Sequence, residues 1–377
     1  MGRWNCAIKL FRRQDKNRFF EIAVLSYLVI FTYEPLSVSP LFVGMRNAMR
    51  SVKIIFTIFL VFFCPLSWAE NAFQSYELPT AYSLPTKIAV QKTGDIWFIA
   101  SNLNRIGRYQ PAEGVFSEYD IPTLQSMPAD IVVSQTGKVW FTEQDSNQLA
   151  VFDPASLAFK EYDIPTIGSS PYQIAMDAEG GVWFTEFYGN KIGYFDPAQE
   201  VFKEYPVPTP SSRPSGIYVG PYGYVWFMET QGNKLGRLNP KTGSIREYDL
   251  PTPFEVPSDI VIDEAGAIWF GARKAHSLMV FYPLKETFDV FPIPNRGVIE
   301  SLSVGRNRNI FFTFRTSNKI GGFDTAKKEF LEIRVGMGKS RPNGIGVDRS
   351  GNIWFADTAK NALFKLDGEA VSKLWLN

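Results

Sequence analysis

The 377-residue chain has few of the side chains on which enzyme chemistry most often depends. It contains one histidine, His276, and two cysteines, Cys6 and Cys64. Two cysteines cannot build a disulfide-rich scaffold, and neither a Cys-rich nor a His-rich metal cluster is possible. Any mechanism that needs two histidines is excluded. An excess of basic charge is also missing, since 39 Lys and Arg balance 38 Asp and Glu, which argues against a nucleic-acid binder with a generally basic surface.

Residues 49–69 have the pattern of a secretory signal peptide. A short basic start from Met49 precedes the apolar run Ile54–Phe63, and small residues stand at Ser67 and Ala69. This order of features is typical of a leader cleaved after Ala69. The run is shorter than the roughly 20 residues that span a membrane. We therefore expect a periplasmic or secreted protein.

Residues 1–48 precede that leader and have two interpretations. Either translation starts later, at Met45 or Met49, or the apolar stretch from Ile22 to Tyr33 is an extra anchor with a basic flank. The first 69 residues hold both cysteines and nine of the 39 basic residues, but only three of the 38 acidic ones. The chain from residue 70 onward is therefore mildly acidic, and it must fold without a disulfide.

The rest of the chain repeats one unit seven times. An aromatic-Phe motif recurs every 42 or 43 residues, at Trp97, Trp140, Trp183, Trp226, Trp269, Phe311 and Trp354. A glycine stands three residues before each of these aromatics except Phe311, where Arg308 replaces it. Each unit contains four strand-like pieces separated by Gly, Pro and Asn turns, and the first piece follows a proline. We therefore predict an all-β, seven-bladed β-propeller with four-stranded blades over residues 70–377.

Closure of the ring requires the two ends of the chain to meet in one blade. The segment Phe73–Pro79 matches the fourth strand of a unit, and we expect it to join the last blade. The segment Val371–Leu376 could fill the same place, so the sequence leaves the outermost strand open.

The repeated motifs resemble those of one known family. Trp140-Phe-Thr-Glu143, Trp183-Phe-Thr-Glu186, Asn190-Lys-Ile-Gly193 and Glu161-Tyr-Asp-Ile-Pro-Thr166 are similar to the streptogramin lyase (virginiamycin B lyase) family over residues 73–377. The resemblance implies a carbon–oxygen lyase that opens type B streptogramins with Mg²⁺ and a general base. It also implies no organic cofactor.

The catalytic histidines implied by the resemblance are missing. The family pattern places histidine directly after the proline of late inner strands, as Pro-His-x-Ile. The corresponding residues here are Thr86, Ala129, Tyr172, Ser215, Ser258, Glu300 and Asn343. The last unit has Arg341-Pro342-Asn343 where the family has Glu-Pro-His, and arginine cannot bind Mg²⁺ as a carboxylate does. We therefore expect the family's activity to be altered or lost.

The single histidine occupies a turn position. The residue seven after each repeated aromatic is Asn104, Asn147, Asn190, Asn233, His276, Asn318 or Asn361. Asparagine and histidine both tolerate left-handed backbone geometry. His276 is therefore expected to be structural.

An acidic residue three after several of these aromatics is the main candidate for a metal site. These residues are Glu143, Glu186, Glu229 and Asp357. If they converge at one mouth of the channel, they could bind Mg²⁺, or alternatively Ca²⁺, or hold a proton at a raised pKa. The alternative is that each one bonds the backbone of its own blade.

The other site candidates are expected beside those carboxylates. Glu186, Glu300 and Tyr172 are the candidate catalytic groups, and Arg213, Arg341 and Asn343 are the candidate substrate-binding groups. The tryptophans are expected to be core residues.

Three functions stay open on the sequence alone. The chain is a lyase-like propeller with an altered site, a non-catalytic propeller that binds an envelope protein or glycan, or a lactone hydrolase of the gluconolactonase type. We expect a monomer that acts on a small ester or lactone or binds an envelope partner, and that does not bind nucleic acid.

Overall fold

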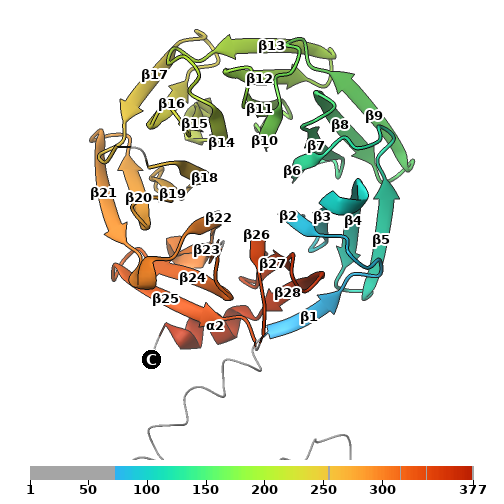
Figure 1. The fold of residues 1–377 in the computed structure, drawn as a ribbon, viewed down its shortest axis with the longest axis vertical. Coiled ribbons are helices and arrows are strands. Elements are labelled where there is room, and N and C mark those ends of the chain that lie inside the picture. The colour runs from blue at the N-terminus through green and yellow to red at the C-terminus, as the bar shows by residue number, and fades with distance from the viewer. Residues whose placement is uncertain (1–72, 254, 315, 337, 376–377) are drawn as a thin grey trace, which may run out of the picture. The chain divides into compact units, whose positions relative to one another are not determined.

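The computed structural model describes residues 73–253, 255–314, 316–336 and 338–375, which form a closed ring of seven four-stranded antiparallel sheets (Figure 1). The predicted all-β, seven-bladed propeller is confirmed. The leader at 49–69 and residues 1–48 lie outside the described residues. Within the described part of the chain, no helix is long and apolar enough to cross a membrane.

Each blade runs from an inner strand at the channel to an outer strand at the rim. Blade 1 comprises β2 (Pro85–Val90), β3 (Ile96–Ala100), β4 (Arg105–Gln110) and β5 (Val115–Asp120). Blade 2 comprises β6 (Pro128–Val133), β7 (Val139–Glu143), β8 (Gln148–Asp153) and β9 (Ala158–Asp163). Blade 3 comprises β10 (Pro171–Met176), β11 (Val182–Glu186), β12 (Lys191–Asp196) and β13 (Val201–Pro206). Blade 4 comprises β14 (Pro214–Val219), β15 (Val225–Glu229), β16 (Lys234–Leu238) and β17 (Ile245–Asp249).

The remaining three blades repeat this order. Blade 5 comprises β18 (Pro257–Ile262), β19 (Ile268–Ala272), β20 (Ser277–Tyr282) and β21 (Thr287–Pro292). Blade 6 comprises β22 (Ile299–Val304), β23 (Ile310–Phe314), β24 (Lys319–Asp324) and β25 (Glu329–Arg334). Blade 7 comprises β26 (Pro342–Val347), β27 (Ile353–Asp357), β28 (Ala362–Leu366) and β1 (Phe73–Glu77).

The N-terminal strand closes the ring. Strand β1 pairs with β28, with Phe73 opposite Leu366 and Glu77 opposite Ala362. The expectation that Phe73–Pro79 joins the last blade is confirmed. The alternative for Val371–Leu376 is wrong, because helix α2 (Gly368–Leu374) covers most of that segment. Asp367 caps this helix by accepting hydrogen bonds from the amides of Glu369 and Ala370, which favours a helix over a strand there.

The second strand of each blade forms the core. All five residues are buried in β3, β7, β11, β15, β19, β23 and β27. In blades 1, 3, 4 and 6 a glycine of the third strand lies against the phenylalanine of the second, whereas blades 2, 5 and 7 have Ala150, Met279 and Phe364 there. A Cβ at Gly193 would come within 2.2 Å of Phe184. Only glycine fits at so close an approach, which explains the repeated Lys-Ile-Gly motif.

A threonine of the second strand links adjacent blades across a bulge. In each inner strand the register shifts just after its first residue, as between Pro171 and Ile174. Thr185 Oγ1 accepts a hydrogen bond from the amide of Gln173 in this bulge and donates to the carbonyl of Ser215 in the next blade. The bulge therefore presents backbone groups that the repeated threonine satisfies.

The turn asparagines join one blade to the next. Asn190 Nδ2 donates to the carbonyls of Val207 and Thr209, and its Oδ1 accepts from the amide and hydroxyl of Ser212. Asn361 makes the corresponding bonds to Thr80 and Ser83, so it also helps to close the ring. His276 has the same left-handed backbone, with φ of 50°, and the structure confirms it as a turn residue.

Candidate functional site

The four carboxylates of the expected metal site lie inside their own blades. Glu143, Glu186, Glu229 and Asp357 are completely buried. A Cβ at Gly189 would lie 2.6 Å from Glu186 Oε2 and 3.1 Å from Ser169, so this glutamate is folded under the loop that follows its strand. Asp357 accepts hydrogen bonds from the amides of Arg341, Ala359 and Lys360. The expected convergence of these groups at the channel is therefore not found.

A carboxylate that must bind a metal ion has to lose its proton, and burial opposes this in three of the four. Burial raises the pKa of Glu143 to about 7 and of Glu186 and Glu229 to about 8. For Glu186, the neighbouring Glu204 adds to the effect and Lys191 opposes it. Among the described residues, no group of three or more His, Cys, Asp or Glu side chains could hold a metal ion. Binding of Mg²⁺ or Ca²⁺ stays a prediction without an assembled site.

The residues that face these carboxylates differ between blades in a complementary way. Blades 2 to 4 combine a loop serine with a glutamate, as in Ser169 with Glu186. Blade 5 exchanges the roles, since Glu255 replaces the serine and Ala272 replaces the glutamate. The Glu255 carboxylate accepts a hydrogen bond from the amide of Ala275. In blades 2 to 5 the space beneath the loop is therefore filled by a glutamate, either from the end of the second strand or from the loop before the inner strand. This favours the structural interpretation of the acidic residues.

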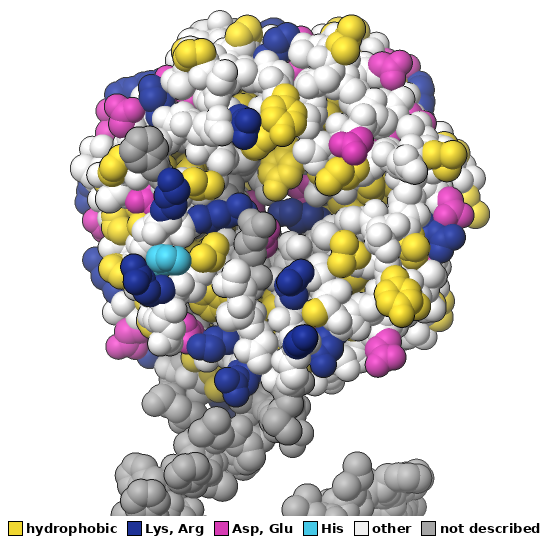
Figure 2. Space-filling view, in the orientation of Figure 1, with side chains coloured by type: hydrophobic (Ala, Val, Ile, Leu, Met, Phe, Trp, Pro, Cys, Tyr) yellow, Lys and Arg dark blue, Asp and Glu magenta, His cyan; other side chains and the backbone are white. Residues whose placement is uncertain are grey.

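The charged residues that do meet across the channel come from the inner strands. We call the face on which the inner strands begin the upper face. A cavity of about 180 Å³ opens there, and it is lined by residues of six blades that include Lys87, Tyr172, Gln173, Arg273 and Glu300. We call this cavity the upper pocket. Figure 2 shows Lys and Arg side chains around a central hollow on the face that carries the single histidine.

The floor of the upper pocket is a network centred on Asp259. Its carboxylate accepts hydrogen bonds from Gln173 Nε2 (3.2 Å), Ser301 Oγ (2.7 Å) and the amide of Leu302 (3.1 Å). Lys87 Nζ lies 3.9 Å from the same carboxylate. Four blades thus contribute to one buried polar network, which holds their inner strands together.

The electrostatics of this network favour a charged lysine. Burial alone would lower the pKa of Lys87, but Asp259 and Asp130 raise it above its usual value. Burial raises the pKa of Asp130 to about 6, although Lys87 opposes that rise. Asp130 also accepts a hydrogen bond from the amide of Ile174 in the next blade.

The upper pocket contains an arginine, Arg273, with one hydrogen-bond donor that is not paired with a described residue. Arg273 Nη2 lies 3.4 Å from Glu300 Oε2, and both side chains are about three-quarters buried or more, with 25% and 20% exposed. Arg273 Nε is buried and has no hydrogen-bond partner among the described residues. An unpaired buried donor costs free energy, which makes this atom a candidate donor to a ligand oxygen.

The predicted site residues are divided by the structure into two groups. Tyr172 and Glu300 line the upper pocket. Arg213 lies at its edge, where its guanidinium stacks 5.5 Å from the ring of Phe187, a lining residue, and 5.3 Å from that of Tyr188. The lining of the pocket includes neither Arg341, whose backbone amide bonds Asp357, nor Asn343, nor Glu186.

The sequence analysis missed the residues that make the pocket floor. Lys87, Asp130, Gln173, Asp259 and Ser301 all stand two residues after the start of an inner strand. The same position is glycine in blades 4 and 7. A signal was present in the sequence, because this position carries charge of both signs while the residue after it is isoleucine or leucine in every blade.

Comparison with known proteins identifies the family of this chain. A family model described as the virginiamycin B lyase family matches residues 68–280 and 159–372. The chain belongs to the virginiamycin B lyase family. No curated protein matches the sequence.

Solved structures of the virginiamycin B lyase family have the same fold. The chain is 29% identical to selenomethionine virginiamycin B lyase from Staphylococcus aureus, with a TM-score of 0.74, and the match covers 78% of this chain and 98% of that one. A catalytically inactive histidine-to-alanine variant of that lyase, solved with quinupristin, matches with a TM-score of 0.73, 29% identity and the same coverage. An extracellular domain of a hybrid two-component system from B. thetaiotaomicron matches in fold alone, at 19% identity with a TM-score of 0.61, covering 75% of this chain and 40% of that one.

Proposed function

We propose that this member of the family is an exported, monomeric propeller that binds a small oxygen-rich ligand in the upper pocket and does not open streptogramins. The ligand is a carboxylate, ester or lactone. The observation that carries the proposal is Arg273, which lines the cavity and whose buried Nε has no acceptor among the described residues. The loss of the family's lyase activity follows from the residues that replace its histidines, Glu300 and Asn343.

The chemistry of the pocket suits a ligand oxygen. Arg273 and Lys87 can donate to a carboxylate or carbonyl group, and Gln144 and Gln173 add amide groups of either polarity. Glu300 and Asp259 balance the two cations, so the pocket does not need a ligand of high charge. Its volume of about 180 Å³ is below the roughly 300–1,000 Å³ of sites that enclose drug-sized molecules. A ligand of sugar-acid size is therefore favoured.

The binding proposal is tested by calorimetry with gluconate on the chain from residue 70 onward. We expect saturable binding that Arg273→Gln weakens at least tenfold, because the substitution removes the unsatisfied donor and its charge. Glu186→Gln is the control, since it also changes one buried polar side chain and lies outside the pocket. Absence of gluconate binding, or equal loss in both variants, would refute the proposal.

Loss of lyase activity is tested separately with quinupristin. We expect no opening of its ring above the buffer rate, with or without Mg²⁺, because no imidazole stands at the inner-strand positions. Ring opening at a rate proportional to protein concentration would show that another base replaces the histidines.

Lactone hydrolysis is the second candidate, and the position of Glu300 favours it. This carboxylate lies in the same pocket as Tyr172 and Arg273, where it could accept a proton from water while Arg273 holds the carbonyl oxygen. The test is hydrolysis of glucono-1,5-lactone with and without Ca²⁺. Activity that Glu300→Gln abolishes while gluconate still binds would make the protein a hydrolase.

A further inference from the structure

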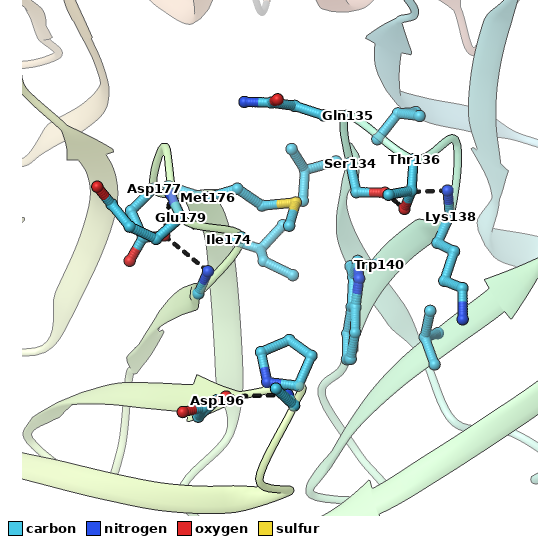
Figure 3. Close-up of a pocket in the computed structure, with 18 of the residues that line it drawn as sticks. Ser134, Gln135, Thr136, Lys138, Trp140, Ile174, Met176, Asp177, Glu179 and Asp196 are labelled. Carbon is cyan, nitrogen blue, oxygen red and sulfur yellow. Dashed lines mark hydrogen bonds between the residues drawn. The ribbon is translucent and has the colours of Figure 1, made fainter.

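A second cavity lies on the lower face, where the inner strands end, between blades 2 and 3. It has a volume of about 1150 Å³ and is lined by the hairpin turns that follow β6 and β10, among other residues. Figure 3 shows Trp140 on one side of it and Met176 with Ile174 on the other. We call this cavity the lower groove. It shares no lining residue with the upper pocket.

The side chain opposite Trp140 on the third strand, in the wall of the lower groove, is short. In four other blades a long side chain on the third strand covers the repeated tryptophan. These side chains are Arg108 at 5.6 Å from the Trp97 ring, Tyr194 at 4.5 Å from Trp183, Arg237 at 5.6 Å from Trp226 and Lys365 at 5.8 Å from Trp354. Val151 stands opposite Trp140 and cannot reach across it. The indole therefore has no such cover.

Trp140 also lacks the acceptor that other blades provide for the indole nitrogen. Trp97, Trp183, Trp269 and Trp354 donate to Gln91, Asp177, Asp263 and Asp348, each six residues earlier. Ser134 holds this position in blade 2, and its hydroxyl bonds Thr136 and the amide of Lys138. Trp140 is only 4% exposed, and its Nε1 makes no hydrogen bond to the described residues. Of the blades that carry a tryptophan, blade 2 alone lacks both the cover and the acceptor.

The rim of the lower groove is acidic. Its two lysines are already paired, Lys138 with Asp153 at 3.5 Å and Lys160 with Glu200. Asp177, Glu179 and Asp196 also line the groove, and none of the three forms a salt bridge with a described residue. The rim therefore keeps an excess of negative charge next to apolar walls of Val132, Ile174 and Met176.

We propose that the lower groove binds a small molecule with an apolar body, an acceptor oxygen and a cationic amine. The apolar body contacts Val132, Ile174 and Met176, where burial of apolar surface stabilises it. The oxygen accepts from Trp140 Nε1, which otherwise stays unpaired. The amine lies at the acidic rim, near Glu179 and Asp196.

Three related probes separate the requirements of the lower groove. Procaine has an aromatic body, an ester carbonyl and a tertiary amine, benzocaine lacks that amine, and 4-aminobenzoate is an anion. Calorimetry on the chain from residue 70 onward should give saturable binding of procaine, at least fivefold weaker binding of benzocaine, and no binding of 4-aminobenzoate in this groove. Equal binding of procaine and benzocaine, or no binding of procaine, would overturn the proposal.

Two variants locate the binding site. Val151→Arg supplies the side chain that blades 1 and 4 have at this position, and it should reduce procaine affinity at least tenfold while the melting temperature shows that the blade still folds. Glu179→Gln changes an exposed rim residue and should reduce affinity about two- to fivefold, as expected for one exposed charge. Glu113→Gln, at an exposed residue of blade 1 that lines neither cavity, is the control that should leave procaine affinity unchanged. Retention of procaine binding in both groove variants would contradict the assignment.

Discussion

Two regions of this propeller use charged residues in opposite ways. Beneath the loops that follow the second strands, acidic residues repeat from blade to blade, are fully buried and serve their own blade. At the upper pocket, one inner-strand position varies between Lys, Asp, Gln, Ser and Gly, and charged residues meet across the channel around Asp259 and Arg273. The contrast teaches that in a repeat protein a residue type that repeats from blade to blade indicates a role in folding. A position at which the repeat is broken is instead a candidate for ligand binding.

The largest expected effect is on the repeated core. Gly193→Val should destabilise the fold by about 3 kcal/mol, because any Cβ would overlap the ring of Phe184 and overpacking of this kind is costly. Thermal unfolding measures the loss. The exposed Val201→Thr in the same blade is the control and should change the stability by less than about 0.5 kcal/mol.

The second effect is on the turns that join the blades. Asn190→Ala removes two donated and two accepted hydrogen bonds, and we expect a loss of about 2 to 4 kcal/mol at about 1 kcal/mol per bond. Urea unfolding checks this value. A loss no larger than that of Arg273→Gln would contradict the division between repeated and non-repeated positions.

The next effect is on the pH dependence of stability, to which the repeated buried glutamates should contribute more than Asp130, whose pKa rises only to about 6. The pKa of Glu186 and Glu229 is about 8 in the folded chain, above the ordinary glutamate value of about 4.3. The folded state therefore binds more protons than the unfolded state between these values, and stability should fall as the pH rises from about 4.5 to 8. Melting temperatures across this range provide the measurement.

Glu186→Gln identifies the source of that dependence. Glutamine is neutral at every pH, so the variant should lose part of the slope and be more stable than the parent at pH 8 by about 1 kcal/mol, the equivalent of roughly one pKa unit. Gluconate binding should stay the same. A steeper slope in the variant would show that the carboxylate is charged and paired in the folded chain.

The smallest expected effect concerns the single histidine. His276→Asn restores the residue that the other turns have, and it removes an imidazole whose Nδ1 is buried without a partner. We expect a gain in stability below about 1 kcal/mol and no change in gluconate binding or in any lactone hydrolysis. Loss of either activity would show that the histidine contributes to the site.

The repeat predicted the fold well because its signals are local. The Trp-Phe strands, the glycine before them and the turn asparagines each depend on contacts within a blade or with its neighbour. Even the exception was informative, since Arg308 adopts the left-handed φ of 62° in place of the repeated glycine. The closing strand β1 was also predicted, but the final segment was not separated from it, because a helix cap at Asp367 decides its structure.

The site was predicted less well because it depends on which residues meet across the channel. Glu300 and Tyr172 line the upper pocket, whereas Glu143, Glu186 and Glu229 were expected at the channel and lie beneath loops. The periodic pattern shows that these glutamates occupy equivalent positions in their blades, but it does not show in which direction their side chains point. Arg273 follows the end of β19, at a position where the sequence has one other arginine, Arg315, and otherwise Ser, Gln, Phe or Thr, so the periodic pattern gave it little weight.

The most direct test of this account is one crystal structure of the chain from residue 70 onward, soaked with gluconate and MnCl₂. We predict gluconate in the upper pocket with an oxygen within hydrogen-bond distance of Arg273 Nε, and no manganese at the buried glutamates. Manganese bound at Glu143, Glu186 or Glu229, with the upper pocket holding only solvent, would contradict the account.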